Sequence, residues 1–207
     1  MLARQLTKFV RLYRPVSADE VLSAGRRALH VTFDDAFRSV ASALPTLRRL
    51  GVPATVFACS DHAEDGGPLG VEELVDQVKA NPAELATMRW DELRALVDEG
   101  IEVGSHTASH PHLIRLEDME LRRELLESRE RIEDELGRRC RFLAYPFGEE
   151  DDRVRAAARA AGYLAAFALR TDRNRLDSFS IPRLGIWRND RLLRTAAKTA
   201  LRRDLKR

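Results

Sequence analysis

The stretch Leu29-His30-Val31-Thr32-Phe33-Asp34-Asp35 decides how the rest of the chain is organised. Its apolar and β-branched residues are typical of a buried β-strand. The two aspartates at its end are not, because adjacent carboxylates repel each other and aspartate is rare in strands. A bound cation or a substrate proton would compensate for that repulsion and would explain the pair. The alternative is a strand-to-loop turn in which one aspartate caps the following helix, and on this stretch alone a turn is the simpler interpretation.

The composition is that of one globular domain covering residues 1–207. Hydrophobic residues make up 44% of the chain and charged residues 33%, and the length is sufficient for a full core. A net charge of only +2 gives no reason to expect nucleic acid as a partner. The two cysteines, Cys59 and Cys140, are far apart in the sequence, so we expect buried thiols and neither a disulfide framework nor a metal site.

No segment of the sequence has the pattern of a signal peptide or a membrane span. Basic residues interrupt the apolar residues of 1–14, and no run approaches the roughly 20 apolar residues that a transmembrane helix needs. We therefore expect a cytoplasmic protein, provided that the sequence is not trimmed of an export signal.

Short apolar strands alternate with longer amphipathic helices along the chain. The pattern predicts strands at 28–33, 52–58, 101–104, 141–145 and 163–168, and a last extended piece at 178–186. It predicts helices at 37–50, 71–78, 90–99, 117–136 and 152–161. Residues 1–26 are also expected to be helical, with a break at Pro15 and a second short helix at 18–24. This alternation favours parallel βαβ units, in an open wound sheet or a barrel. In both architectures the functional groups collect at the carboxyl ends of the strands.

Three of the five histidines follow the strand at 101–104, within Ser105–His112. His106 and His110 are four residues apart, which would place both imidazoles on one side of a helical turn. With one of the two aspartates they would form a site of two nitrogens and one oxygen, leaving positions open for water and substrate. His112 does not fit this spacing, so we expect it to be structural. The histidine pair alone would more often be surface or capping residues.

Three ordered motifs, each after a predicted strand, resemble the polysaccharide deacetylase family (carbohydrate esterase family 4, the NodB homology domain). They are Thr32–Asp35, His106–Pro111 and Tyr145–Gly148, and the resemblance extends over about residues 28–168. It implies a distorted, incomplete (β/α) barrel with parallel strands and outer helices. Residues 1–26 and 188–207 would then be flanking helices.

The resemblance also implies roles for individual residues. Asp35, His106 and His110 would bind a divalent metal, most often Zn²⁺, with Co²⁺, Ni²⁺ or Mn²⁺ as alternatives. Asp34 would be the general base that activates a water for attack on an N-acetyl or N-formyl amide of an amino sugar or glycoconjugate. The backbone amide of Phe147 would stabilise the oxyanion. Thr107, Tyr145, Pro146 and Gly148 would belong to the substrate site. There Thr107 would orient its loop by bonding backbone, and Pro146 and Gly148 would fix the loop that carries Phe147.

The sequence departs from the family pattern at several positions. The glycine that often follows the two aspartates is Ala36, a mild change if the backbone there does not have a positive φ. The arginine that orients the base is replaced by Ala144, and Arg183 is our candidate substitute among 31 arginines. No histidine follows His112, so the family's late general-acid histidine is absent. Either Asp34 returns its proton to the leaving amine, or a group such as His62 takes that role, and we favour Asp34.

Other interpretations remain open at this point. The missing histidine and arginine are consistent with a sugar-binding or regulatory relative that has lost turnover, and some relatives hydrolyse amides of non-sugar ureides. Trp187 could line an acetyl pocket, although a core position is the simpler interpretation. The basic segment 188–207 has helical spacing and could rest on an anionic membrane surface, but packing on its own domain is favoured. The sequence does not define an oligomeric state.

Overall fold

The protein is described by a computed structural model that covers residues 2–24, 27–71, 75–169 and 177–186. Trp187 and the predicted helix at 188–207 lie outside these described residues. Within the described ranges, no helix is both long enough and apolar enough to cross a membrane.

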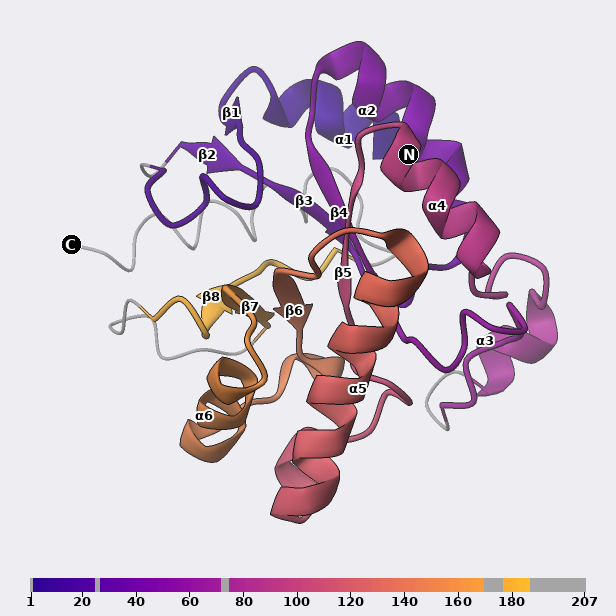
Figure 1. Ribbon diagram of the computed structural model, residues 1–207. Coiled ribbons are helices and arrows are strands. Elements are labelled where there is room, and N and C mark those ends of the chain that lie inside the picture. The colour runs from indigo at the N-terminus through magenta and orange to yellow at the C-terminus, as the bar shows by residue number, and fades with distance from the viewer. Residues whose placement is uncertain (1, 25–26, 72–74, 170–176, 187–207) are drawn as a thin grey trace.

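A curled sheet of six parallel strands forms a half-barrel (Figure 1). Its strands follow one another in space in the same order as in the sequence, so each connection moves one position along the sheet. They are β3 (Val31–Phe33), β4 (Ala54–Ala58), β5 (Glu102–Ser105), β6 (Phe142–Ala144), β7 (Ala165–Ala168) and β8 (Ile181–Pro182). A separate two-stranded sheet pairs β1 (Arg14–Pro15) with β2 (Ala28–Leu29). The expected incomplete (β/α) barrel is confirmed.

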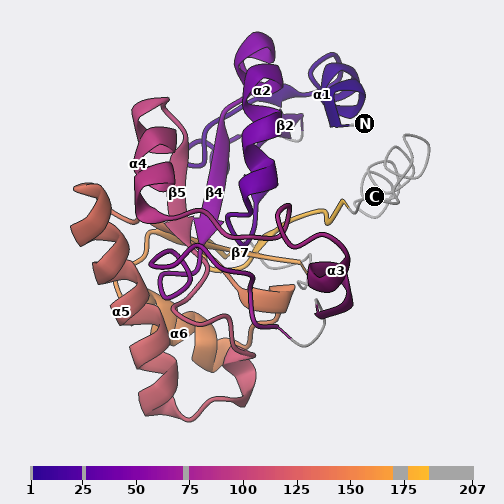
Figure 2. The same ribbon diagram turned by 90° about the vertical axis from the view of Figure 1, so that its right-hand side faces the viewer.

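Helices follow one another around the outside of this sheet, and Figure 2 shows α3 set apart from α5 on the other side of the molecule. They are α1 (Leu2–Phe9), α2 (Leu44–Leu50), α3 (Val75–Ala80), α4 (Trp90–Asp98), α5 (Asp118–Leu136) and α6 (Asp152–Ala160), with short 3₁₀ segments η1 (Arg38–Ala43), η3 (Leu113–Arg115) and η4 (Pro146–Gly148). Gly51 ends α2 and Gly137 ends α5, each with φ near +60°, directly after the ends of the predicted helices at 37–50 and 117–136.

Alternation along the strands divides the buried residues into two layers. One face contributes Val56, Val103 and Leu143 to the core beneath α4, α5 and α6. The other face contributes Phe57, Phe142 and Phe167 to the interior of the half-barrel, where the Phe57 and Phe167 ring centroids lie 5.6 Å apart. The interior is therefore packed with side chains, and only its carboxyl-terminal end is lined by the polar residues of the predicted site.

The N-terminal segment differs from the prediction. Residues 18–23 form turns and not a helix, and Pro15 lies in strand β1. The Glu20 carboxylate accepts hydrogen bonds from the Ser17 backbone N–H (2.9 Å) and hydroxyl (3.1 Å), which favours a turn there. The predicted strand at 28–33 is divided at His30, whose ring nitrogens lie 2.9 Å from the Val16 carbonyl and from the Thr55 hydroxyl.

The predicted helix at 37–50 begins as a 3₁₀ segment and becomes α-helical only at Leu44. The two buried cysteines are free thiols, as predicted.

Candidate metal and catalytic site

The two aspartates follow β3 in a tight turn with unusual backbone geometry. Asp35 has φ of 65° and Ala36 has φ of 48°, a region in which alanine is strained and glycine is not. The condition under which alanine would be a mild replacement for the family's glycine is therefore not met. The turn is held by the Ala36 carbonyl, which accepts a hydrogen bond from the Met88 N–H at 2.8 Å. Strain of this kind persists where surrounding contacts determine the backbone.

The loop that carries His106 and His110 is not helical, so the predicted helical turn is wrong. Both histidines still face the same aspartate because Thr107 and His110 adopt positive φ values of 71° and 68°. The Thr107 side chain is fully buried, and its hydroxyl accepts a hydrogen bond from the His110 N–H at 3.1 Å. Thr107 thus orients the backbone of a predicted metal ligand, and its side chain has no exposed surface that a substrate could contact.

Glu124 of α5 supports this loop and is not among the site residues predicted from the sequence. Its side chain is buried, and its carboxylate accepts hydrogen bonds from Ala108 N (2.9 Å), Ser109 N (3.0 Å) and Ser109 Oγ (2.7 Å). Three donors on one carboxylate hold the middle of the loop in place. The available signal was its position, because Glu124 lies on the same helix stripe as Leu121 and Leu125.

We expect Glu124→Ala to lower the free energy of unfolding by about 1–3 kcal/mol, because two backbone N–H groups would lose their buried acceptor. Chemical denaturation would measure the change. Glu127→Ala is the matched control, since Glu127 is exposed on the same helix. Equal effects of the two substitutions would contradict the proposed support of the loop by Glu124.

Asp35, His106 and His110 converge on one point. One ligand atom from each lies within 4.8 Å of the other two, and Asp35 Oδ1 is 3.5 Å from His106 Nε2 and 3.4 Å from His110 Nε2. His106 Nδ1 lies 2.7 Å from the Ala144 carbonyl. Because a carbonyl only accepts, Nδ1 donates this hydrogen bond, and Nε2 is the ring nitrogen that faces the carboxylate.

The polar atoms at this point fit a divalent metal. Asp35 Oδ1 is buried and has no hydrogen-bond partner among the described residues, and the same holds for Nδ1 of His110. Burial raises the pKa of Asp35 to about 6, opposed by His106 and reinforced by Asp34. Burial and then the proximity of His106 lower the pKa of His110 to about 3. A cation bound by the Nε2 atoms of His106 and His110 and by Asp35 Oδ1 would satisfy the buried carboxylate oxygen, and zinc commonly takes such ligands. It would not reach His110 Nδ1, which lies on the other side of the ring.

Asp34 points to a different partner, the guanidinium of Arg183. Arg183 Nη1 donates to Asp34 Oδ1 (2.5 Å) and to the Thr32 hydroxyl (3.0 Å), and Nη2 donates to Asp34 Oδ2 (2.9 Å). Burial alone would raise the pKa of Asp34, but the charge and hydrogen bonds of Arg183, with the two histidines, leave it below its ordinary value. The structure therefore places the guanidinium of Arg183 against Asp34. The family's base-orienting arginine is Ala144 in this chain, and Arg183 was the substitute suggested from the sequence.

The turn at Tyr145–Gly148 lies beside the histidines. Phe147 has φ of 59°, and the hydrogen bonds of the turn run from Gly148 N to Tyr145 O (2.9 Å) and from Glu149 N to Pro146 O (3.3 Å). The Phe147 N–H is not used by either bond. Gly148 has φ of 69°, and a Cβ there would lie 2.3 Å from that of Leu169, so glycine is required.

The side chains of this turn differ from their predicted role in substrate binding. Tyr145 is fully buried, and its hydroxyl donates to the Phe179 carbonyl at 2.9 Å, so its side chain does not reach a substrate. Pro146 and Gly148 are also buried. Phe147 is partly exposed, and its ring stacks on His112 with centroids 3.8 Å apart and planes at 9°. His112 also lies 2.9 Å from a carboxylate oxygen of Glu149, which agrees with the structural position predicted for it.

The comparison with family models identifies the chain. The model described as polysaccharide deacetylase matches residues 22–166, which include all three motifs. The chain belongs to the polysaccharide deacetylase family. This membership confirms the family suggested by the motifs, and it agrees with the half-barrel and with the position of the motifs at its strand ends.

Among curated relatives of this deacetylase-family chain, YxkH of Bacillus subtilis (strain 168), named for the same family, is 22% identical over 134 residues. That match covers 64% of this chain and 41% of YxkH, so the chain spans about two fifths of the length of that relative.

Two solved structures share the fold. IcaB from Ammonifex degensii superposes with a TM-score of 0.75 at 21% identity, covering 95% of this chain and 87% of that one. The Streptococcus pyogenes deacetylase PplD, solved in complex with acetate, superposes with a TM-score of 0.73 at 20% identity, covering 95% and 84%.

Proposed function

We propose that this protein is a metal-dependent deacetylase that hydrolyses the N-acetyl (or N-formyl) amide of an amino sugar within a polysaccharide or glycoconjugate. The observation that carries the proposal is the convergence of Asp35, His106 and His110 on one point, beside an aspartate paired with arginine. Family membership supports the reaction class, and the acetate bound to PplD supports an acetyl group.

A divalent metal, Zn²⁺ by preference, would be held by Asp35, His106 and His110. When bound, it would lower the pKa of a water toward neutrality and polarise the amide carbonyl. The hydrogen bond from His106 to the Ala144 carbonyl would fix the tautomer of one ligand, and the buried Thr107 and Glu124 would fix the loop that carries both histidines.

Asp34 would act as the general base. Its lowered pKa keeps the carboxylate ionised at neutral pH, and the Arg183 fork aligns both of its oxygens. After taking a proton from the attacking water, Asp34 would return it to the leaving amine, since the late histidine of the family is absent from the sequence. His62, the alternative acid, is half-buried in the turn after β4, and burial lowers its pKa.

The Phe147 N–H would stabilise the oxyanion that forms during attack. It belongs to a turn whose other N–H groups are already bonded, and its left-handed backbone is held by the stacked His112 ring and by the packing around Gly148. A preorganised donor of this kind needs no reorganisation as charge develops. The Phe147 side chain takes no part in this stabilisation.

We expect the purified protein to release acetate or formate from oligomers of N-acylated amino sugars. Activity should disappear after chelation and return on addition of Zn²⁺, Co²⁺, Ni²⁺ or Mn²⁺. Acetate release, measured enzymatically across a panel of N-acetyl and N-formyl sugars and non-sugar ureides, tests the proposal. A metal-loaded preparation that is inactive on the sugars but active on a ureide would overturn it.

Binding of acylated sugars without product, unchanged by Asp34→Ala, would identify a binding protein that has lost turnover.

A further inference from the structure

Arg183 is presented by a short and weakly supported strand. β8 has only two residues, paired with Phe167 and Ala168 of β7 at the end of the six-stranded sheet. The Arg183 N–H donates to the Ala168 carbonyl at 2.8 Å. So few main-chain bonds do not fix the direction of a long side chain, and the segment needs other anchors.

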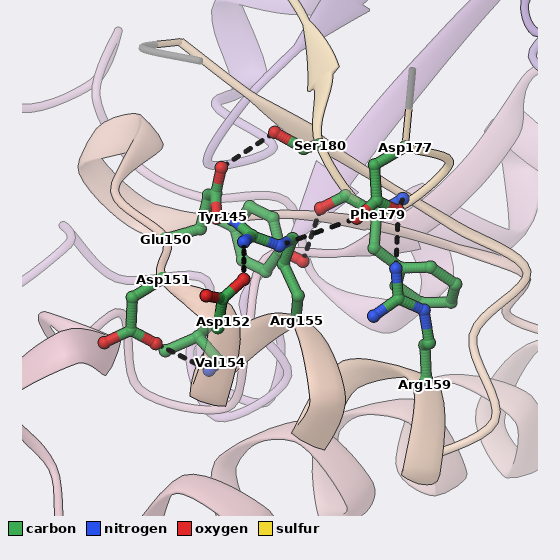
Figure 3. A network of polar contacts seen from close by, with 10 residues as sticks. All are labelled: Tyr145, Glu150, Asp151, Asp152, Val154, Arg155, Arg159, Asp177, Phe179 and Ser180. Atoms are coloured by element: carbon green, nitrogen blue, oxygen red, sulfur yellow. Dashed lines mark hydrogen bonds and ion pairs between the residues drawn. The ribbon is translucent and has the colours of Figure 1, made fainter. Parts of the chain in front are cut away.

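The residues just before β8 are anchored by a buried charged network (Figure 3). Ser180 Oγ donates to Glu150 Oε1 at 2.7 Å, and Arg155 forms an ion pair with Glu150 and lies 3.6 Å from Asp177 Oδ2. Asp177 Oδ1 accepts from the Phe179 N–H at 2.9 Å. The Glu150, Asp177 and Arg155 side chains are only 5%, 9% and 11% exposed.

Glu150 connects the two halves of the candidate site. It follows the Phe147–Gly148 turn by two residues, and through Ser180 it holds the segment that ends at Arg183. In the same region the Tyr145 hydroxyl donates to the Phe179 carbonyl, as Figure 3 shows. The turn that offers the oxyanion donor and the strand that delivers the arginine are thus tied to one carboxylate.

Stability alone does not account for such a network. Buried ion pairs are often no more stabilising than apolar side chains of the same size, because desolvating the charges offsets their attraction. Their directional bonds do fix geometry. This chain has Ala144 where the base-orienting arginine would stand, so its arginine comes from a different strand that requires positioning of its own.

We propose that Glu150 and Ser180 are positioning residues that hold Arg183 against Asp34. The proposal rests on the proposed function, in which Asp34 is the base. The Ser180–Glu150 hydrogen bond acts through Arg183, so loss of this bond lowers kcat only while Arg183 is present.

The kinetic test is a double-mutant cycle. Ser180→Ala is expected to lower kcat about tenfold with little change in KM, because a small displacement of the aligned base slows the reaction without weakening substrate binding. In an Arg183→Ala background the same change should have no further effect. Ser178→Ala is the matched control, since within the described part of the chain Ser178 forms a hydrogen bond through its backbone carbonyl, from Ala166 N–H, and none through its hydroxyl. An equal loss from Ser180→Ala in both backgrounds would overturn the proposal.

A second measurement needs no activity. Amide hydrogen exchange at Arg183 should be faster in Ser180→Ala than in the wild-type protein and unchanged in Ser178→Ala. If the wild-type protein hydrolyses no substrate while exchange responds in this way, the proposed function fails and the anchoring of Arg183 stands. Unchanged exchange at Arg183 in Ser180→Ala would overturn the anchoring itself.

Discussion

Asp34→Asn is expected to lower kcat/KM by about 10²–10⁴-fold, the usual contribution of a general base. The amide retains the shape of the carboxylate but has no basic oxygen to take the proton. The same change leaves the Arg183 guanidinium, only 10% exposed, facing a neutral group. We therefore also expect a loss of about 1–3 kcal/mol in the free energy of unfolding, because a buried charge loses its partner.

A double variant separates the two effects. In Asp34→Asn/Arg183→Met the orphaned charge is removed, so the free energy of unfolding should recover while kcat/KM stays as low as in Asp34→Asn. Urea denaturation and acetate release, measured on the same preparations, check this. Residual activity in Asp34→Asn within a few-fold of the wild-type protein would exclude Asp34 as the base, whatever happens to stability.

The arrangement of strand ends was predictable because it follows from local patterns. Apolar runs that end in unusual polar residues identified β3 and β5, a turn motif followed β6, and parallel strands bring their carboxyl ends to one edge. The long helix was expected at 117–136 and is found at Asp118–Leu136, since its apolar period extends over several turns.

The backbone of the site was not predictable in the same way. Left-handed conformations at Asp35, Ala36, Thr107 and His110 have no sequence signal, because none of these residues is a glycine. The surrounding bonds impose them: Met88 holds one turn, and Glu124 holds the other loop. The spacing of four residues between His106 and His110 therefore predicted a helical turn. In the structure both histidines face Asp35 because Thr107 and His110 adopt left-handed backbone conformations.

The burial of Tyr145 and of Glu124 could also be predicted from the sequence, by strand alternation and by helix periodicity. Tyr145 continues the alternation of β6, in which Leu143 faces the outer helices and Phe142 faces the barrel interior. That alternation assigns Tyr145 to the helix side, away from a substrate. Glu124 likewise lies on the buried stripe of α5, where a carboxylate needs partners. Arg183 was one candidate among many arginines, and the fold brings it within 2.5–2.9 Å of Asp34.

Asp35→Asn is expected to change metal binding and stability in opposite directions. As a predicted metal ligand, Asp35 contributes more than a residue that only supports a ligand, so its loss should weaken zinc binding by more than about 100-fold. In the metal-free protein, however, Asp35 is a buried carboxylate whose pKa is raised to about 6. Asparagine removes that buried charge, so the metal-free variant should be the more stable protein at neutral pH.

The raised pKa of Asp35 also determines how the free energy of unfolding changes with pH. A carboxyl with a folded-state pKa of about 6 and an ordinary value of 3.8 contributes stability below pH 4 and loses it as the pH rises through 6. The metal-free wild-type protein should therefore lose up to about 2–3 kcal/mol relative to Asp35→Asn between pH 4 and pH 7. Urea denaturation in chelator at a series of pH values measures the difference, with the exposed Asp65→Asn as control. If the metal-free variant were less stable than the wild-type protein at pH 7, Asp35 would have a bonding partner that a metal does not replace, and the assignment of this carboxylate as a metal ligand would be wrong.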